Sequence, residues 1–338
     1  MPVWSPAPRS PPIDFLPHRP RIFFGWYIVA AASASLFIQA STGGFTFSIF
    51  LPAMKADLGW PLSTLVLASS ITAITTAVAG PWLGKTVDRR GPRLVMVLSV
   101  LAMGGAFFAA GWVQEPWQFY LVIGLVSGAA RSALQGVVPG SMIANWFTRR
   151  RASAYATAAM GPPIANFLLP PIITFLVATG GWRAAWMGLG GIAVAVGLLP
   201  ALLIARRIEG TGWLPDGDSP GSAAGAAAAQ HDASARGGDW TVGEAVRSPA
   251  FWMIAIGMSL ILMAPNTSIL FLFSYLTSQG LEPHTATLAI SMTSGLQVVS
   301  RLFFWGPFIN RMGSVRWVLV LWGCMLLFST LVFGLAQE

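Results

Sequence analysis

The sequence contains little charge and almost no cysteine. Charged residues make up 9% of its 338 residues, whereas soluble domains contain about 25%. Twelve acidic and twenty basic side chains cannot cover the surface that a soluble protein of this length exposes. The single cysteine, Cys324, excludes an internal disulfide and any metal site built from several cysteines. We therefore expect neither a soluble fold nor a nucleic-acid partner, and no cofactor or metal.

Hydrophobic residues, by contrast, make up 55% of the chain. They gather in nine runs that are long enough for membrane-spanning helices, which need about 20 mostly apolar residues. The runs lack the strict alternation of transmembrane β-strands, so the sequence predicts an all-α polytopic membrane protein. The predicted spans cover residues 24–50, 62–83, 94–113, 118–143, 153–178, 184–205, 250–275, 285–308 and 317–336.

Basic residues predict the orientation of these spans. If the N-terminus is cytoplasmic, sixteen of the twenty bases lie in cytoplasmic segments, and only Lys55 and Arg183 lie outside. The other two, Arg131 and Arg301, fall within spans. This bias is the positive-inside pattern. All but two of the bases are arginine, which is typical of a GC-rich bacterial gene, so we expect a multi-pass protein of the bacterial inner membrane.

The spans group into two predicted bundles. Residues 1–21 form a cytoplasmic tail, residues 22–205 a six-helix bundle, and residues 249–338 an incomplete second bundle of three helices. Residues 206–248, rich in Ala, Gly and Pro, are typical of a disordered cytoplasmic linker. Near its end, Thr241 and Glu244 have the spacing of a helix capping box, which leaves open a short helix or plain coil.

A pattern of glycine and charge follows the second span and recurs after the eighth. The first copy contains Gly84, Asp88, Arg89, Gly91 and Arg93; the second contains Gly306, Asn310, Arg311 and Gly313. Their first glycines lie 222 positions apart, which predicts an internal repeat. Glycine permits a tight reversal, and the bases favour the anionic cytoplasmic leaflet. The alternative is an ordinary charged turn.

With this pattern the sequence resembles the major facilitator superfamily, whose halves repeat this loop. Three further motifs, at residues 57–60, 145–147 and 181–183, resemble its monocarboxylate porter and oxalate:formate antiporter branch. The resemblance implies two six-helix bundles, alternating access and a gating role for both loops. Twelve helices are expected and nine are present. The chain is then either a fragment of a longer transporter or a truncated product that does not transport.

Arg131 and Arg301 are the candidate substrate-binding charges. A charged side chain at the centre of a membrane helix costs about 2.5–3.5 kcal/mol on insertion scales. None of the nine predicted spans contains Asp or Glu, so a bound anion would neutralise these arginines. Two structural alternatives remain: Arg131 bonds to carbonyls of neighbouring helices, and Arg301 reaches the cytoplasmic interface.

Neutral polar residues at membrane depth form a second set of candidates. They are Gln39, Asn166, Asn266 and Tyr275. Each could instead make an ordinary bond between helices, worth about 0.6 kcal/mol.

The sequence thus predicts a monomeric secondary transporter of small organic anions, with the lipid bilayer as its surroundings. No acid or histidine lies in a predicted span, which favours anion exchange, or a proton that binds after the substrate as the coupling ion. The alternative within transport is a facilitator that exports hydrophobic compounds. A membrane-embedded enzyme is disfavoured because His18, His231 and His284 all lie in predicted tails or loops.

Overall fold

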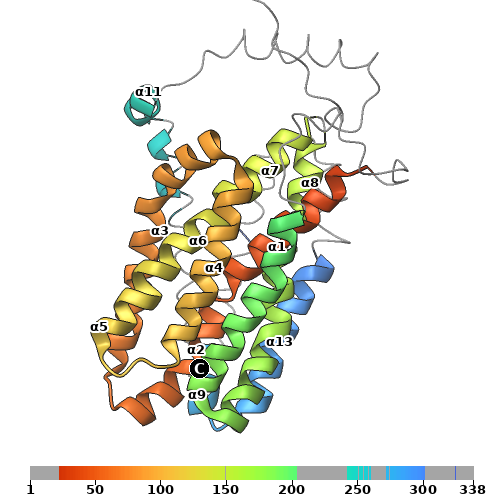
Figure 1. The fold of residues 1–338 in the computed structure, drawn as a ribbon. Helices are drawn as coiled ribbons and strands as arrows, with labels where there is room; N and C mark the ends of the chain where they lie inside the picture. The colour runs from red at the N-terminus through yellow and green to blue at the C-terminus, as the bar shows by residue number, and fades with distance from the viewer. Residues whose placement is uncertain are drawn as a thin grey trace, which may run out of the picture.

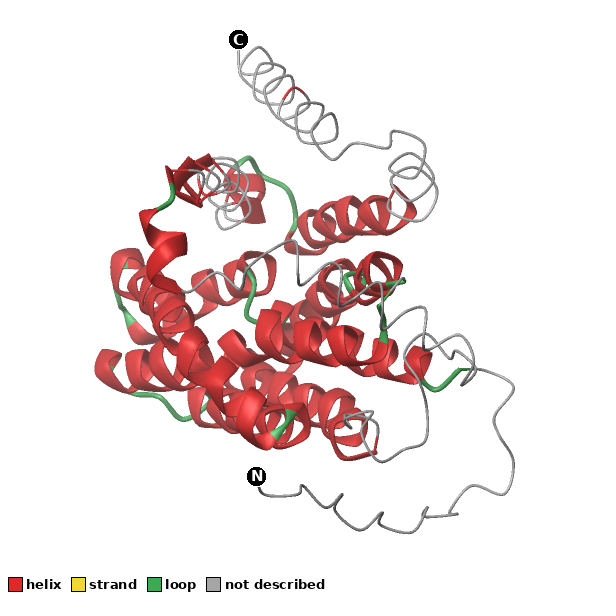
Figure 2. Ribbon diagram, turned by 90° about the horizontal axis from the view of Figure 1, so that it is seen from above, coloured by secondary structure: helices red, strands yellow, loops and turns green. Residues whose placement is uncertain are grey.

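The structure is a computed structural model. It describes residues 23–148, 150–203, 242–249, 275–300 and 324, together with positions 251–253, 255–257, 259, 272 and 273. All secondary structure in this part of the chain is helical (Figure 2). Four of its helical stretches are long and apolar enough to cross a membrane: Leu62–Arg90, Pro92–Ala110, Pro116–Trp146 and Ser153–Leu202. The prediction of an all-α polytopic membrane protein is therefore confirmed.

The first predicted span, 24–50, is not one helix. It consists of α1 (Gly25–Ala40) and α2 (Gly44–Leu58), separated by residues 41–43. Side-chain hydroxyls replace some of the backbone hydrogen bonds that the helix loses at this break. Ser41 donates to the carbonyl of Ile38, and Thr42 donates to the carbonyl of Gln39 over 2.9 Å. Such local bonds offer the backbone an alternative to the helix. The interruption lies within the bundle.

The second and third spans meet at a single glycine. Helix α3 (Leu62–Arg90) and helix α4 (Pro92–Ala110) are joined by Gly91, whose φ of 87° and ψ of 163° are open only to glycine. We expected the whole charged motif to form the turn. Instead Gly84, Asp88 and Arg89 continue α3 for about two turns beyond the predicted end at residue 83, and Pro92 begins α4.

The fourth span is continuous but irregular. It runs through α5 (Pro116–Phe119), the π-helical η1 (Tyr120–Ser127), α6 (Gly128–Ser132), the π-helical η2 (Ala133–Val137) and α7 (Val138–Trp146). Hydroxyls of neighbouring helices donate to its carbonyls. Thr72 reaches Ile123 over 3.0 Å, Thr76 reaches Gly128 over 3.0 Å, and Ser35 reaches Leu134 over 2.9 Å. These bonds compensate for the disturbed π-helical ladder.

The fifth and sixth predicted spans lie in α8 (Arg151–Ala158) and α9 (Gly161–Leu203). Helix α9 reverses at Gly181, where φ is 75° and ψ 173°. Its second part packs closely on α4, because a Cβ atom on Gly190 would lie 2.8 Å from the carbonyl oxygen of Gly104. Small residues commonly allow membrane helices to approach in this way. Figure 1 shows α1, α4 and α9 side by side in the bundle.

Helices α11 and α13 lie further along the chain. Helix α11 (Val242–Arg247) confirms the short helix that the capping-box spacing left open. Helix α13 (Pro283–Ser300) lies in the predicted eighth span and packs against α9 (Figure 1). The hydroxyls of Thr174 and Thr287 lie 3.0 Å apart at this contact. Most of the seventh span and nearly all of the ninth lie outside the described residues.

Candidate functional site

A small cavity of about 40 Å³ lies inside the bundle. Its walls come from the break between α1 and α2, from α2, α3 and the irregular fourth span, and from α9. It is lined by Thr42, Phe47, Ser69, Thr72, Ile123, Arg131 and Trp186. Because one buried water needs about 10–15 Å³ of such volume, the cavity can hold a few waters or one small polar group of a ligand.

Arg131 brings a positive charge to this cavity. It lies in α6, between the two π-helical segments, and its side chain is partly buried. Its Nη1 donates to the carbonyl of Thr42 over 3.3 Å and to the Thr42 hydroxyl over 3.4 Å. Both bonds are longer than typical N–H···O bonds of 2.7–3.2 Å. Arg131 forms no ion pair with any residue that the structure describes.

These contacts bring both interpretations of Arg131 together. The guanidinium does bond to a neighbouring helix carbonyl, as the structural alternative predicts, and that carbonyl belongs to the broken first span. The same side chain also lines the cavity. One arginine therefore bonds to the interruption of the first span and also lines a small cavity with mixed polar and apolar walls.

Buried polar atoms without a hydrogen-bond partner among the described residues gather near this interruption. They are Gln39 Oε1, Thr46 Oγ1, Asn166 Oδ1 and Trp186 Nε1, with Ser291 Oγ further along the chain. Gln39 lies in the last turn of α1. Asn166 Oδ1 lies 3.9 Å from the point that a Cβ on Gly43 would occupy, which places Asn166 beside the break. An unsatisfied buried polar group costs about 1–3 kcal/mol.

The other predicted site residues lie elsewhere. Tyr275 is 41% exposed and is not among the residues that line the cavity. Arg301 and Asn266 lie outside the described residues, as do the second-loop residues Gly306, Asn310, Arg311 and Gly313. In the first loop, Arg93 is exposed in the first turn of α4.

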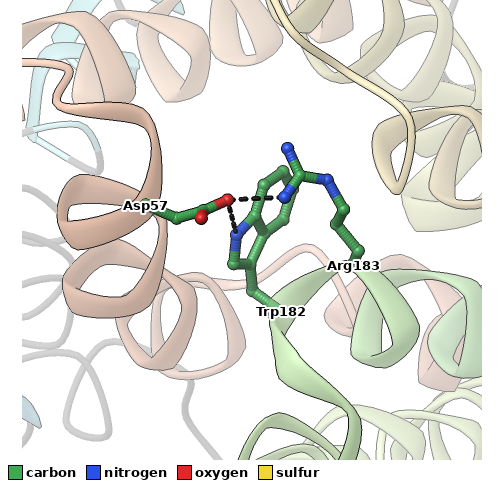
Figure 3. Close-up of polar contacts among 3 residues, drawn as sticks. All are labelled: Asp57, Trp182 and Arg183. Atoms are coloured by element: carbon green, nitrogen blue, oxygen red, sulfur yellow. Dashed lines mark hydrogen bonds and ion pairs between the residues drawn. The ribbon is translucent and has the colours of Figure 1, made fainter.

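A polar cluster at one end of the bundle joins two motifs that the resemblance singled out separately (Figure 3). Asp57 comes from the end of α2, whereas Trp182 and Arg183 follow the Gly181 turn. The Asp57 carboxylate accepts a 2.9 Å hydrogen bond from the Trp182 indole and forms an ion pair with Arg183. The Trp182 hydrogen bond, followed by that of Arg183, lowers the pKa of Asp57.

Most residues that line the cavity were missed by reasoning from sequence, among them Ser69, Thr72 and Trp186. Hydroxyls in apolar helices are common, and Trp186 reads as one more apolar residue of the sixth span, so neither pattern marks a site. No group of three or more His, Cys, Asp or Glu side chains that could hold a metal lies together in the described part of the chain.

Comparison with known proteins extends the resemblance to nearly the whole chain. A family model of the Major Facilitator Superfamily matches residues 32–337. Monocarboxylate transporter 11 of Mus musculus is 27% identical over 214 residues, which cover 62% of this chain and 45% of that protein. Monocarboxylate transporter 7 of Homo sapiens is 28% identical over 191 residues, 55% of this chain and 35% of that protein. The chain spans less than half the length of these two relatives.

A solved structure agrees at the level of the fold. The crystal structure of a D-xylose-proton symporter aligns with 82% of this chain and 66% of its own, with a TM-score of 0.54 and 13% sequence identity. The two chains therefore share a fold. Sequence model, relatives and fold agree that this chain belongs to the major facilitator superfamily, a family of membrane transporters rather than enzymes.

Proposed function

We propose that this protein is a secondary transporter of small organic anions, mono- or dicarboxylates, that works by alternating access in the bacterial inner membrane with its N-terminus in the cytoplasm. One observation carries the proposal: Arg131 lines a small cavity within the bundle and has no acidic partner among the described residues. A bound carboxylate would supply the missing negative charge through charge-assisted hydrogen bonds. The names of the relatives, which are monocarboxylate transporters, favour the same substrate class.

The geometry suggests how binding would proceed. The two long bonds from Arg131 to Thr42 are weak enough to exchange for shorter bonds to a carboxylate. Release of Thr42 would allow the segment between α1 and α2 to move, because this segment already lacks regular helical backbone hydrogen bonds. Alternating access would then follow from rocking of the 22–205 bundle against the 249–338 bundle around this region.

The coupling mode follows from the charges near the site. The helices that line the cavity contribute no acidic or histidine side chain to it, so we favour anion exchange over a built-in proton relay. A proton that enters together with the carboxylate is the other scheme compatible with this lining.

Replacing Arg131 by Gln tests the proposal. We expect Arg131→Gln to lower the affinity for carboxylates at least tenfold, because it removes the positive charge and the charge-assisted bonds. The measurement is counterflow of radiolabelled mono- and dicarboxylates into proteoliposomes preloaded with unlabelled anion. Arg183→Gln is the matched control, since Arg183 already pairs with Asp57 at the end of the bundle; we expect it to leave the affinity unchanged.

Two outcomes would overturn this proposal. Normal counterflow in Arg131→Gln would remove Arg131 from the site, and a simultaneous loss in Arg301→Gln would assign the substrate charge to the eighth span. Transport of hydrophobic compounds that carboxylates do not inhibit would favour the export facilitator instead.

A further inference from the structure

We propose that the indole N–H of Trp186 is a second donor to the bound carboxylate and acts together with Arg131. This inference rests on the proposed function and adds a residue of α9 to the site. Trp186 and Arg131 line the same cavity from different spans, the sixth and the fourth. That cavity is small, about 40 Å³, so a ligand group within it would lie near both side chains.

The Trp186 indole lacks an acceptor. Its side chain is 1% exposed, and its Nε1 has no hydrogen-bond partner among the described residues. A buried N–H without a partner is unfavourable, because it has lost its bond to water and gained none in return. An indole can only donate, so the group that it requires is an acceptor. A ligand oxygen in the cavity would meet that requirement.

The protein already contains a complete version of this arrangement. One helical turn before Trp186, the indole of Trp182 and the guanidinium of Arg183 donate to the same oxygen of the Asp57 carboxylate (Figure 3). There one carboxylate satisfies an indole and a guanidinium together. At the cavity, Trp186 and Arg131 supply the same two donor types, and no carboxylate of the described chain accompanies them.

The Trp186 ring is also held in one orientation. It stacks on Phe50, with ring centroids 4.1 Å apart and an interplanar angle of 16°, and it contacts Phe107 with centroids 5.5 Å apart. Little conformational entropy is therefore lost when the N–H takes a partner, and preorganised donors of this kind add affinity. The bonds of Arg131 to Thr42 involve Nη1 alone, whereas a guanidinium carries five N–H donors.

The Trp186→Phe variant tests this inference, since it removes the N–H and keeps an aromatic ring against Phe50. We expect it to weaken acetate, propionate and pyruvate binding about tenfold or more, because hydrogen bonds to charged groups are strong. The measurement is calorimetric titration of the detergent-solubilised protein. Trp182→Phe is the matched control on the same helix: its indole already bonds to Asp57, so we expect unchanged affinity.

A double-mutant cycle separates a ligand contact from a structural role. If both donors meet one carboxylate, Trp186→Phe should have little further effect in an Arg131→Gln background. Equal losses in both backgrounds, together with a lower unfolding temperature, would overturn the inference. So would unchanged affinity in Trp186→Phe while Arg131→Gln loses binding, which is the result expected if water satisfies the indole. Unchanged binding in both single variants would overturn the proposed function itself.

Discussion

Two arginines of this chain have opposite surroundings. Arg183, at the end of the bundle, is 42% exposed and pairs with Asp57, so water also stabilises its charge. Arg131 lies within the fourth span and bonds to a backbone carbonyl and a hydroxyl of Thr42. These acceptors are neutral, so within the described part of the chain the charge of Arg131 has no counter-ion, which is why we propose that it binds an anion. Arg183, by contrast, links α2 to α9 through its ion pair with Asp57.

The pKa of Asp57 makes this end cluster sensitive to pH. Bonds from Trp182 and Arg183 lower the pKa of Asp57 in the folded protein, so the folded state binds its proton less readily than the unfolded state. The stabilisation is therefore fully present above the unfolded aspartate pKa of about 3.9 and is lost as the pH falls through the lowered folded value.

We accordingly expect Asp57→Asn to unfold at a lower temperature than the parent protein at pH 7, with the difference shrinking as the pH falls below the unfolded aspartate pKa of about 3.9. Thermal unfolding of the detergent-solubilised protein across pH measures this. Lys55→Gln is the control, since Lys55 is exposed on the same helix, and it should match the parent throughout. A difference between Asp57→Asn and the parent that persisted unchanged at low pH would contradict the assignment.

At the scale of the helical elements, close approach of α4 and α9 depends on glycine. A Cβ on Gly190 would lie 2.8 Å from the Gly104 carbonyl oxygen, whereas a Cβ on the next residue, Gly191, meets no atom within 4 Å. The clash on Gly190 is with backbone, which cannot rotate away. The two helices would have to separate to admit even one methyl group.

We therefore expect Gly190→Ala to destabilise the protein by about 1–3 kcal/mol, the usual cost of overpacking. Gly191→Ala provides a control with the same chemical change one residue away, and it should be neutral or slightly stabilising because alanine favours helix. Thermal or denaturant unfolding in detergent distinguishes them. Equal stability of the two variants would show that the helices have room to adjust.

The sequence predicted the positions of these elements better than their internal shape. Gly91 and Pro92 mark the junction of α3 and α4 because positive φ and a helix start have clear residue preferences. The break at residues 41–43 was missed, since Ser41 and Thr42 also occur in regular membrane helices. The site shows the same limit: Arg131 is visible because charge is rare in membranes, whereas Trp186 resembles any buried aromatic until its neighbours are known.

At the scale of the whole molecule, charge separates the two ends of the bundle. The end of α3, the start of α4 and the α7–α8 turn lie at the upper end of Figure 1 and carry most of the bases of the described part. The opposite end carries Lys55 and Arg183. The positive-inside rule assigns the first end to the cytoplasm.

Labelling of introduced cysteines tests this orientation. In a Cys324→Ser background, we expect Lys55→Cys to react with a membrane-impermeant maleimide in spheroplasts, because Lys55 is exposed at the predicted outer end. Arg151→Cys, exposed at the other end, should react only after the membrane is permeabilised. The reverse pattern would invert the proposed topology.

The contact between Arg131 and Thr42 has a consequence for ligand affinity. A carboxylate that binds Arg131 as we propose would have to displace the Thr42 oxygens from the guanidinium, so its affinity would be the difference between two hydrogen-bonded states. This competition would lower the affinity and speed dissociation. It would also give the unloaded protein a low-energy arrangement, because after each release the Arg131 guanidinium could bond to Thr42 again. The partly buried charge would then keep hydrogen-bond acceptors between one anion and the next.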